Sequence, residues 1–166
     1  MPAHDKSAAA ETSSSWRSAR LFVTDEFTAP PVILRVEDSV IGTLGNFSAS
    51  TGKAKSKKTF NVCAIVAAAM TGGTVLNYSA SLPPERRRIL YVDTEQSRFH
   101  CKRVLCRILR LAGLPTDAHP PLLEFLCLRG YATKERLRKI EEAIYDLDDL
   151  GLVVIDGIRD LAHDIN

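Results

Sequence analysis

The chain has 166 residues, of which 45% are hydrophobic and 25% are charged, with a formal net charge of +2. This length and composition suit one globular domain that has enough chain to bury a core. A net charge this small does not identify a nucleic-acid-binding protein, although basic residues gather in segments 53–58, 86–88 and 98–110. That clustering is compatible with an anionic ligand.

The N-terminal residues are polar and small, and the longest apolar run, around 62–70, is too short to span a bilayer. We therefore expect a soluble, cytoplasmic protein without a membrane partner. The four cysteines, at positions 63, 101, 106 and 127, lack the spacing of a zinc site, and we expect reduced thiols.

The first third of the chain predicts a disordered tail, a loose lead-in and the start of a core. Residues 1–19 are rich in Ala and Ser, and we expect them to be disordered. Segment 20–39 predicts a lead-in with one short strand at 32–36. A first central strand is expected from residue 40 to about residue 50. An apolar helix follows at 60–70, ended by two glycines.

Strands and helices then alternate to the end of the chain. A polar connection is expected at 77–88. Predicted strands cover 89–92, 122–128 and 152–155; predicted helices cover 98–112, with Ser97 as N-cap, and 133–149, with Thr133 as N-cap and Gly151 as stop. This order predicts an α/β fold over residues 40–166, with a mainly parallel sheet and helices on both faces.

A loop rich in glycine and lysine lies between the predicted central strand and the apolar helix. Aligned on G-x-x-x-x-G-K-[ST], a phosphate-binding loop, it consists of Gly52, Lys53, Ala54, Lys55, Ser56, Lys57, Lys58 and Thr59. In such a loop, backbone N–H groups and the helix N-terminus face a di- or triphosphate, the Lys reaches the β- and γ-phosphates, and the Thr hydroxyl ligates Mg²⁺. A solvated basic turn is the alternative interpretation.

Lys57 stands where the motif has its second glycine. We expect either that Lys57 adopts a helical backbone conformation with its side chain turned outward, or that the loop is impaired. An impaired loop would slow or abolish hydrolysis while binding survives.

Acidic residues follow two other predicted strands. Asp93 and Glu95 follow the strand at 89–92, and Asp156 follows the strand at 152–155. Alone, each has an ordinary explanation, either as a helix-start acid or as a turn residue. Because the carboxyl ends of parallel strands share one edge of a sheet, we expect these acids to lie near Lys58 and Thr59. That set suits a nucleotide–Mg²⁺ site.

The predicted helix at 98–112 has a basic side formed by Arg98, Lys102, Arg103, Arg107 and Arg110. This side is interpreted either as a solvated face or as a surface that lies along a nucleic-acid backbone.

The chain resembles the RecA-like P-loop ATPases, in the branch of KaiC, DnaB-type helicases and plasmid RepA helicases, and it is similar to ATPases encoded on plasmids and mobilisable elements. The resemblance covers residues 40–166 and rests on three motifs in the family's order, GKAKSKKTF, ILYVDTEQS and LGLVVIDGIRDL. It implies ATP and Mg²⁺ as cofactors, DNA as a partner in replication or mobilisation, and a homo-oligomeric, hexameric ring.

The resemblance also implies residue roles. Lys58 would bind phosphate, Thr59 and Asp156 would hold Mg²⁺, and Glu95 rather than Asp93 would be the catalytic acid that polarises water. The chain stops ten residues after Asp156, where the family continues with a sensor strand, DNA-contacting loops and an intersubunit arginine. We therefore expect a truncated product, with either a gap at the centre of the sheet or direct pairing of the loop's strand with the Asp156 strand.

Two other functions remain open. One is a nucleotide-binding module that does not hydrolyse, which the lysine at position 57 favours. The other is a nucleic-acid-binding module without nucleotide chemistry, which would use lysines 53–58 and the basic helix but leaves Glu95 and Asp156 unexplained.

Overall fold

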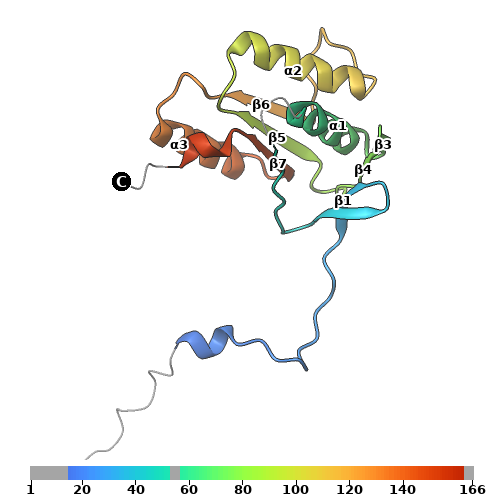
Figure 1. Cartoon of the computed structure of the whole chain (residues 1–166), viewed down its shortest axis with the longest axis vertical. Helices are drawn as coiled ribbons and strands as arrows, with labels where there is room; N and C mark the ends of the chain where they lie inside the picture. The colour runs from blue at the N-terminus through green and yellow to red at the C-terminus, as the bar shows by residue number, and fades with distance from the viewer. Residues whose placement is uncertain (1–14, 53–56, 163–166) are drawn as a thin grey trace, which may run out of the picture.

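The computed structural model describes residues 15–52 and 57–162 and contains two sheets with three α-helices (Figure 1). The strands are β1 Val32–Val36, β2 Ser39–Thr43, β3 Thr74–Val75, β4 Tyr78–Ala80, β5 Arg88–Asp93, β6 Leu123–Cys127 and β7 Leu150–Asp156. The helices are α1 Lys58–Thr71, α2 Arg98–Leu111 and α3 Thr133–Asp146, with short 3-10 helices η1 Ser15–Ala19 and η2 Ile158–Leu161. The predicted α/β fold is confirmed.

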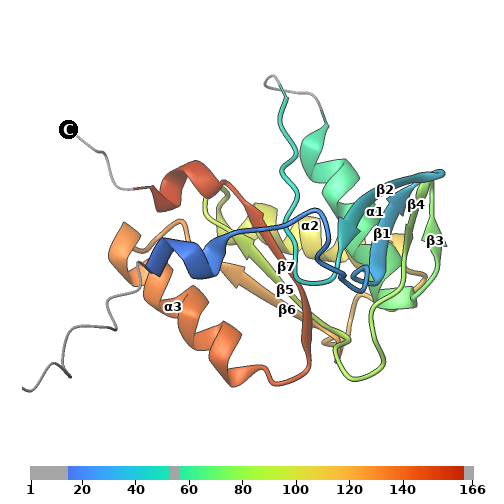
Figure 2. The same cartoon turned by 90° about the horizontal axis from the view of Figure 1, so that it is seen from below.

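The main sheet has three parallel strands in the order β6-β5-β7. Helices α1 and α2 cover one face of this sheet, and α3 covers the other (Figures 1 and 2). The central strand β5 is buried on both sides, and its alternate residues belong to two cores. Ile89 and Tyr91 pack with α1 and α2, whereas Leu90 and Val92 pack with Ile140 of α3. Because successive side chains point to opposite faces of the sheet and both faces are covered, every position from Ile89 to Val92 is apolar.

The prediction of a central strand at 40–50 is wrong. Strand β2 ends at Thr43, pairs antiparallel with β1 and belongs to a second sheet of order β2-β1-β4-β3. A two-residue turn joins β1 to β2, with Glu37 at φ 51°. Closing this short hairpin costs far less chain entropy than bringing residue 40 to the distant parallel sheet. Neither the expected central gap nor the expected direct pairing occurs among the described residues, because the loop has no strand in the parallel sheet.

The segment expected to be a polar connection, 77–88, contains β4, which pairs with β1 and with β3. This second sheet packs on the C-terminal half of α1, where Ala80 joins the core around Ala67 and Met70. Helix α1 ends as predicted at Gly72, which has φ 65° and donates its N–H to the carbonyl of Ala68 at 2.9 Å.

The two predicted N-caps differ in outcome. Ser97 occupies the N-cap position of α2 with an extended backbone, but its hydroxyl pairs with Nδ1 of His100 at 3.0 Å. Thr133 is the first residue of α3 rather than its cap; Ala132 precedes the helix, and its N–H donates to Glu135 Oε2 at 3.3 Å. Helix α3 ends at Asp146, earlier than the predicted end at residue 149, and Gly151 lies inside β7 instead of stopping the helix.

No helix among residues 15–52 and 57–162 is long and apolar enough to cross a membrane. The four thiols are free, with Cys63 and Cys101 buried.

Residues 15–31 extend away from the two sheets (Figure 1). They include the short helix η1, which lies at the end of the segment for which the sequence predicts disorder. Residues 1–14 lie outside the described part.

An ion pair between Arg88 and Asp149 joins β5 to the turn before β7. The Arg88 guanidinium donates from Nε to Asp149 Oδ1 at 2.7 Å, and this hydrogen bond is the main reason why the pKa of Asp149 lies below its ordinary value. A carboxyl whose pKa falls on folding stabilises the fold above its unfolded pKa, about 3.9, and loses that contribution as the pH drops.

We therefore expect Asp149→Asn to lower the thermal unfolding midpoint at pH 7, and the difference from the unsubstituted chain to shrink as the pH falls through the acid range. Thermal unfolding followed by circular dichroism at a series of pH values measures this. Asp148→Asn removes the neighbouring charge, which makes no ion pair within the described residues, and should show no such convergence. A difference for Asp149→Asn that is constant with pH would contradict the assignment.

Candidate active site

The site forms where α1 begins and β7 ends. Thr59, in the first turn of α1, donates its hydroxyl to Asp156 Oδ2 at 3.2 Å, although 97 positions separate the two residues in the chain. Tyr91 of β5 donates its phenol to the same oxygen at 3.2 Å. The Tyr91 ring is fully buried and stacks on Phe125 with 4.5 Å between ring centroids. Two hydroxyls from two elements therefore orient one carboxylate.

Burial raises the pKa of Tyr91 far above its ordinary value, and the nearby charge of Asp156 raises it further. The phenol therefore stays protonated and remains a donor throughout the physiological pH range. Sequence reasoning did not single out Tyr91, because an aromatic residue in an apolar strand is typical of a core.

The loop before α1 is described on both sides of a gap. Lys58 donates from Nζ to the carbonyl of Gly52 at 2.7 Å, so the lysine spans the loop from its last turn back to its first residue. The other predicted loop residues, Lys53, Ala54, Lys55 and Ser56, lie outside the described residues.

Lys57 is exposed and has φ 59° and ψ 24°, which is the left-handed conformation. This contradicts the expected helical backbone conformation at Lys57. The backbone keeps a conformation that glycine adopts without penalty, and the lysine bears the strain, about 1–2 kcal/mol for a residue with a Cβ. Lys57 therefore carries backbone strain at the position where the motif has its second glycine.

The acids after β5 have different environments. Asp93 is fully buried, and its carboxylate accepts three hydrogen bonds: from the N–H of Glu95 at 3.0 Å, from the N–H of Gln96 at 2.7 Å and from Nε2 of Gln96 at 2.8 Å. Asp93 therefore shapes the turn that carries Glu95. The Glu95 side chain is exposed and lines the pocket described below.

The same turn is tied to β7. Thr94 donates its N–H to the carbonyl of Asp156 at 3.1 Å and its hydroxyl to the carbonyl of Gly157 at 2.8 Å. Gly157 has φ 95°, and a Cβ there would collide with the Thr94 hydroxyl. On the other side, the thiols of Cys101 and Cys127 both contact the Gln96 carbonyl at 3.6 Å.

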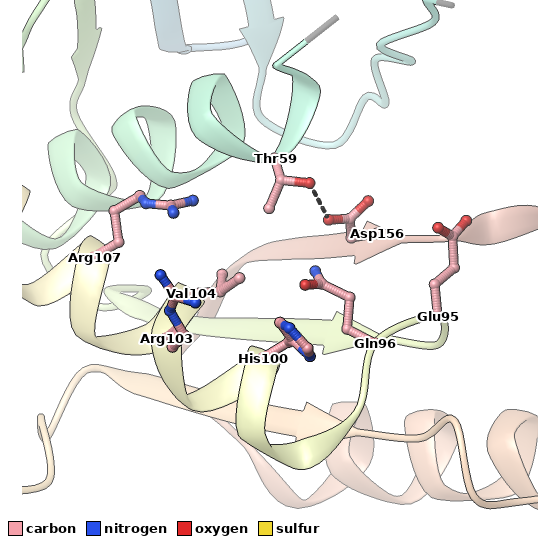
Figure 3. Close-up of a pocket in the computed structure, with 8 residues that line it drawn as sticks. All are labelled: Thr59, Glu95, Gln96, His100, Arg103, Val104, Arg107 and Asp156. Carbon is pink, nitrogen blue, oxygen red and sulfur yellow. Dashed lines mark hydrogen bonds between the residues drawn. The ribbon is translucent and has the colours of Figure 1, made fainter. Parts of the chain in front are cut away.

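A pocket of about 320 Å³ opens between these elements (Figure 3). Its lining residues come from α1, from the turn after β5, from α2 and from β7: Thr59, Glu95, Gln96, His100, Arg103, Val104, Arg107 and Asp156. The structure thus brings Thr59, Glu95 and Asp156 to one cavity, as the edge of a parallel sheet predicts.

Sequence reasoning missed the contribution of α2. The sequence predicts that Arg103 and Arg107 belong to a basic side that is solvated or contacts nucleic acid, but both line the pocket. The signal was available in the spacing: positions 100, 103, 104 and 107 recur at three- and four-residue intervals and share one face. Arg107 also lies beside the Cys63 thiol, where it partly offsets the rise in pKa that burial imposes on that thiol.

The described residues fit a nucleotide with Mg²⁺. Hydroxyl and carboxylate oxygens are the ligands that Mg²⁺ prefers, and Thr59 and Asp156 present one of each. A model of the AAA domain family matches residues 15–166, which is most of the chain. No curated protein and no solved structure gave a significant match. On the family match, the chain belongs to the AAA domain family, of P-loop ATPase type.

Proposed function

We propose that this chain binds Mg-ATP and hydrolyses its terminal phosphate anhydride in the pocket between α1, β5, α2 and β7. The observation that supports this best is the 3.2 Å contact between Thr59 and Asp156, because it joins a phosphate-loop hydroxyl to the acid at the end of a parallel strand. The match to a nucleotide-binding family agrees with it, and so does a pocket that holds a second acid, Glu95.

Each residue has a role in this proposal. Lys58 would leave the Gly52 carbonyl and bind the β- and γ-phosphates. Thr59 and Asp156 would hold Mg²⁺, which when bound neutralises charge on the phosphates. The backbone of residues 52–59, including Lys53, Ala54, Lys55, Ser56 and Lys57, would surround the phosphates. Glu95 would accept a hydrogen bond from the attacking water and aim it at the terminal phosphorus.

At a finer level, we assign the chain to the RecA-like branch that includes KaiC, DnaB-type helicases and plasmid RepA helicases. The support is the order of the three motifs along residues 40–166. Hydrolysis would then drive work on DNA during replication or mobilisation of an element, by a ring of six copies in the cytoplasm. Strand β1, which pairs with β2 and β4, would extend this ATPase core to residue 32.

Calorimetric titration of Mg-ATP into the full chain tests the proposal. We expect Lys58→Ala to weaken binding at least about tenfold, since a hydrogen bond between charged groups contributes about 1.5–3 kcal/mol. Phosphate release measured in the same samples should exceed the background only where Mg-ATP binds.

Lys57→Gly is the matched control, because it removes the same charge from the adjacent position while relieving the left-handed strain. It should bind Mg-ATP as well as the unsubstituted chain. Equal losses in the two variants would reduce the role of Lys58 to net charge and contradict the proposal. Binding without phosphate release would instead support a non-hydrolysing module, and salt-dependent binding of DNA without Mg-ATP would support a nucleic-acid-binding module.

A further inference from the structure

One wall of the pocket is cationic and comes entirely from α2. His100, Arg103, Val104 and Arg107 line the pocket from that helix, opposite Thr59 and Asp156. In Figure 3, the Arg107 side chain extends from α2 toward Thr59, and the Arg103 guanidinium lies between α2 and α1. This wall belongs to the same chain as Thr59, so no second copy is needed to supply positive charge.

The two arginines of this wall lack carboxylate partners within the described residues. Arg103 is exposed, and an exposed arginine without such a partner is common in this part of the chain. Arg107 is half-buried and has the Cys63 thiol beside it, which carries no negative charge while it remains protonated. A partly buried guanidinium without an anion loses hydration without gaining an ion pair, so Arg107 is suited to bind an anion that enters the pocket. Arg103 lines the same pocket and can reach the same anion.

The charges of the pocket indicate which anion. Glu95 and Asp156 contribute two negative charges, which the two positive charges of a bound Mg²⁺ would balance. The positive charges of Arg103 and Arg107 would then be free to balance a phosphate. A guanidinium can donate two parallel hydrogen bonds to phosphate oxygens, which a lysine cannot.

We propose that Arg103 and Arg107 bind the terminal phosphate of a nucleoside triphosphate and distinguish it from a diphosphate. This rests on the proposed function, because it places the phosphate next to Thr59 and Asp156. The two arginines would stabilise the charge on the phosphate in cis and would act in addition to Lys58.

The test compares Mg-ATP with Mg-ADP. Calorimetric titration of both nucleotides into the full chain measures the ratio of the two affinities. We expect Arg107→Gln and Arg103→Gln each to weaken Mg-ATP binding about tenfold, the size of one charged hydrogen bond, and to leave Mg-ADP affinity within about twofold. Arg110→Gln is the matched control, since Arg110 lies on the same helix, is exposed and does not line the pocket.

The outcomes separate the two proposals. If the unsubstituted chain binds neither nucleotide, the proposed function and this inference both fail. If it binds both, but the arginine variants keep the ATP-to-ADP ratio or lose both affinities equally, only this inference is overturned. Circular dichroism monitors folding of the variants, and Arg103→Gln, at an exposed position, still provides the test if Arg107→Gln does not fold.

Discussion

Glu95→Gln should lower the rate of phosphate release about 10²–10⁴-fold at saturating Mg-ATP, the usual contribution of a general base, while leaving Mg-ATP affinity nearly unchanged. The amide keeps the size and position of the side chain but no longer attracts the water proton. Asp93 holds the Glu95 N–H, so the turn that carries residue 95 should keep its shape in the variant. A continuous phosphate assay, combined with calorimetry on the same protein, separates the loss of rate from a loss of binding.

Two other variants define what the Glu95 result means. Glu141→Gln removes an exposed negative charge from α3, away from the pocket, and should retain the full rate. Asp93→Asn should instead destabilise the turn, because a carboxylate that accepts three hydrogen bonds becomes an amide with one acceptor oxygen. If Glu95→Gln hydrolysed at the full rate, another group would have to orient the water, and the assignment of Glu95 would be wrong.

Elements with strong periodicity were predictable from the sequence. Helix α2 shows apolar residues at three- and four-residue intervals, and β5 and β7 are short apolar runs bounded by polar or small residues, so their existence and type were correct. The strand at 40–50 was wrong, because the alignment of the phosphate loop favoured a strand directly before it. Residues 39–43 instead form β2, which pairs with β1 across a turn of two residues. A motif alignment does not predict such pairing between neighbouring strands.

The site was partly predictable for a similar reason. The carboxyl ends of the parallel strands brought Glu95 and Asp156 together, as topology requires. The burial of Asp93 and the left-handed backbone of Lys57 depend on hydrogen bonds and chain geometry that composition does not encode. The direction of Arg103 and Arg107 depends on how α2 packs against α1, and an amphipathic pattern states only which side is buried.

Gly151→Ala should be the most destabilising of the glycine substitutions described here, by about 2–4 kcal/mol, as expected for overpacking against rigid backbone. Leu150 pairs with Arg88 and Leu152 pairs with Ile89, so the pairing of β7 with β5 shifts register at Gly151. Gly151 lies against the backbone of Arg86, which precedes β5. A Cβ at this position would overlap the backbone carbonyl oxygen of Arg86, which cannot rotate away as a side chain does. Urea unfolding followed by circular dichroism measures the loss.

Two other glycines separate this collision from the general effect of adding a methyl group. Gly130→Ala meets no atom within 4 Å and should be nearly neutral, whereas Gly113→Ala, at φ 69° and also without a close neighbour, should cost about 1–2 kcal/mol of backbone strain alone. A loss at Gly151 no greater than that at Gly113 would mean that the turn around Arg86 yields to the methyl group. Because β7 carries Asp156, such yielding would also move the acid relative to Thr59, and Mg-ATP affinity in Gly151→Ala would report that displacement.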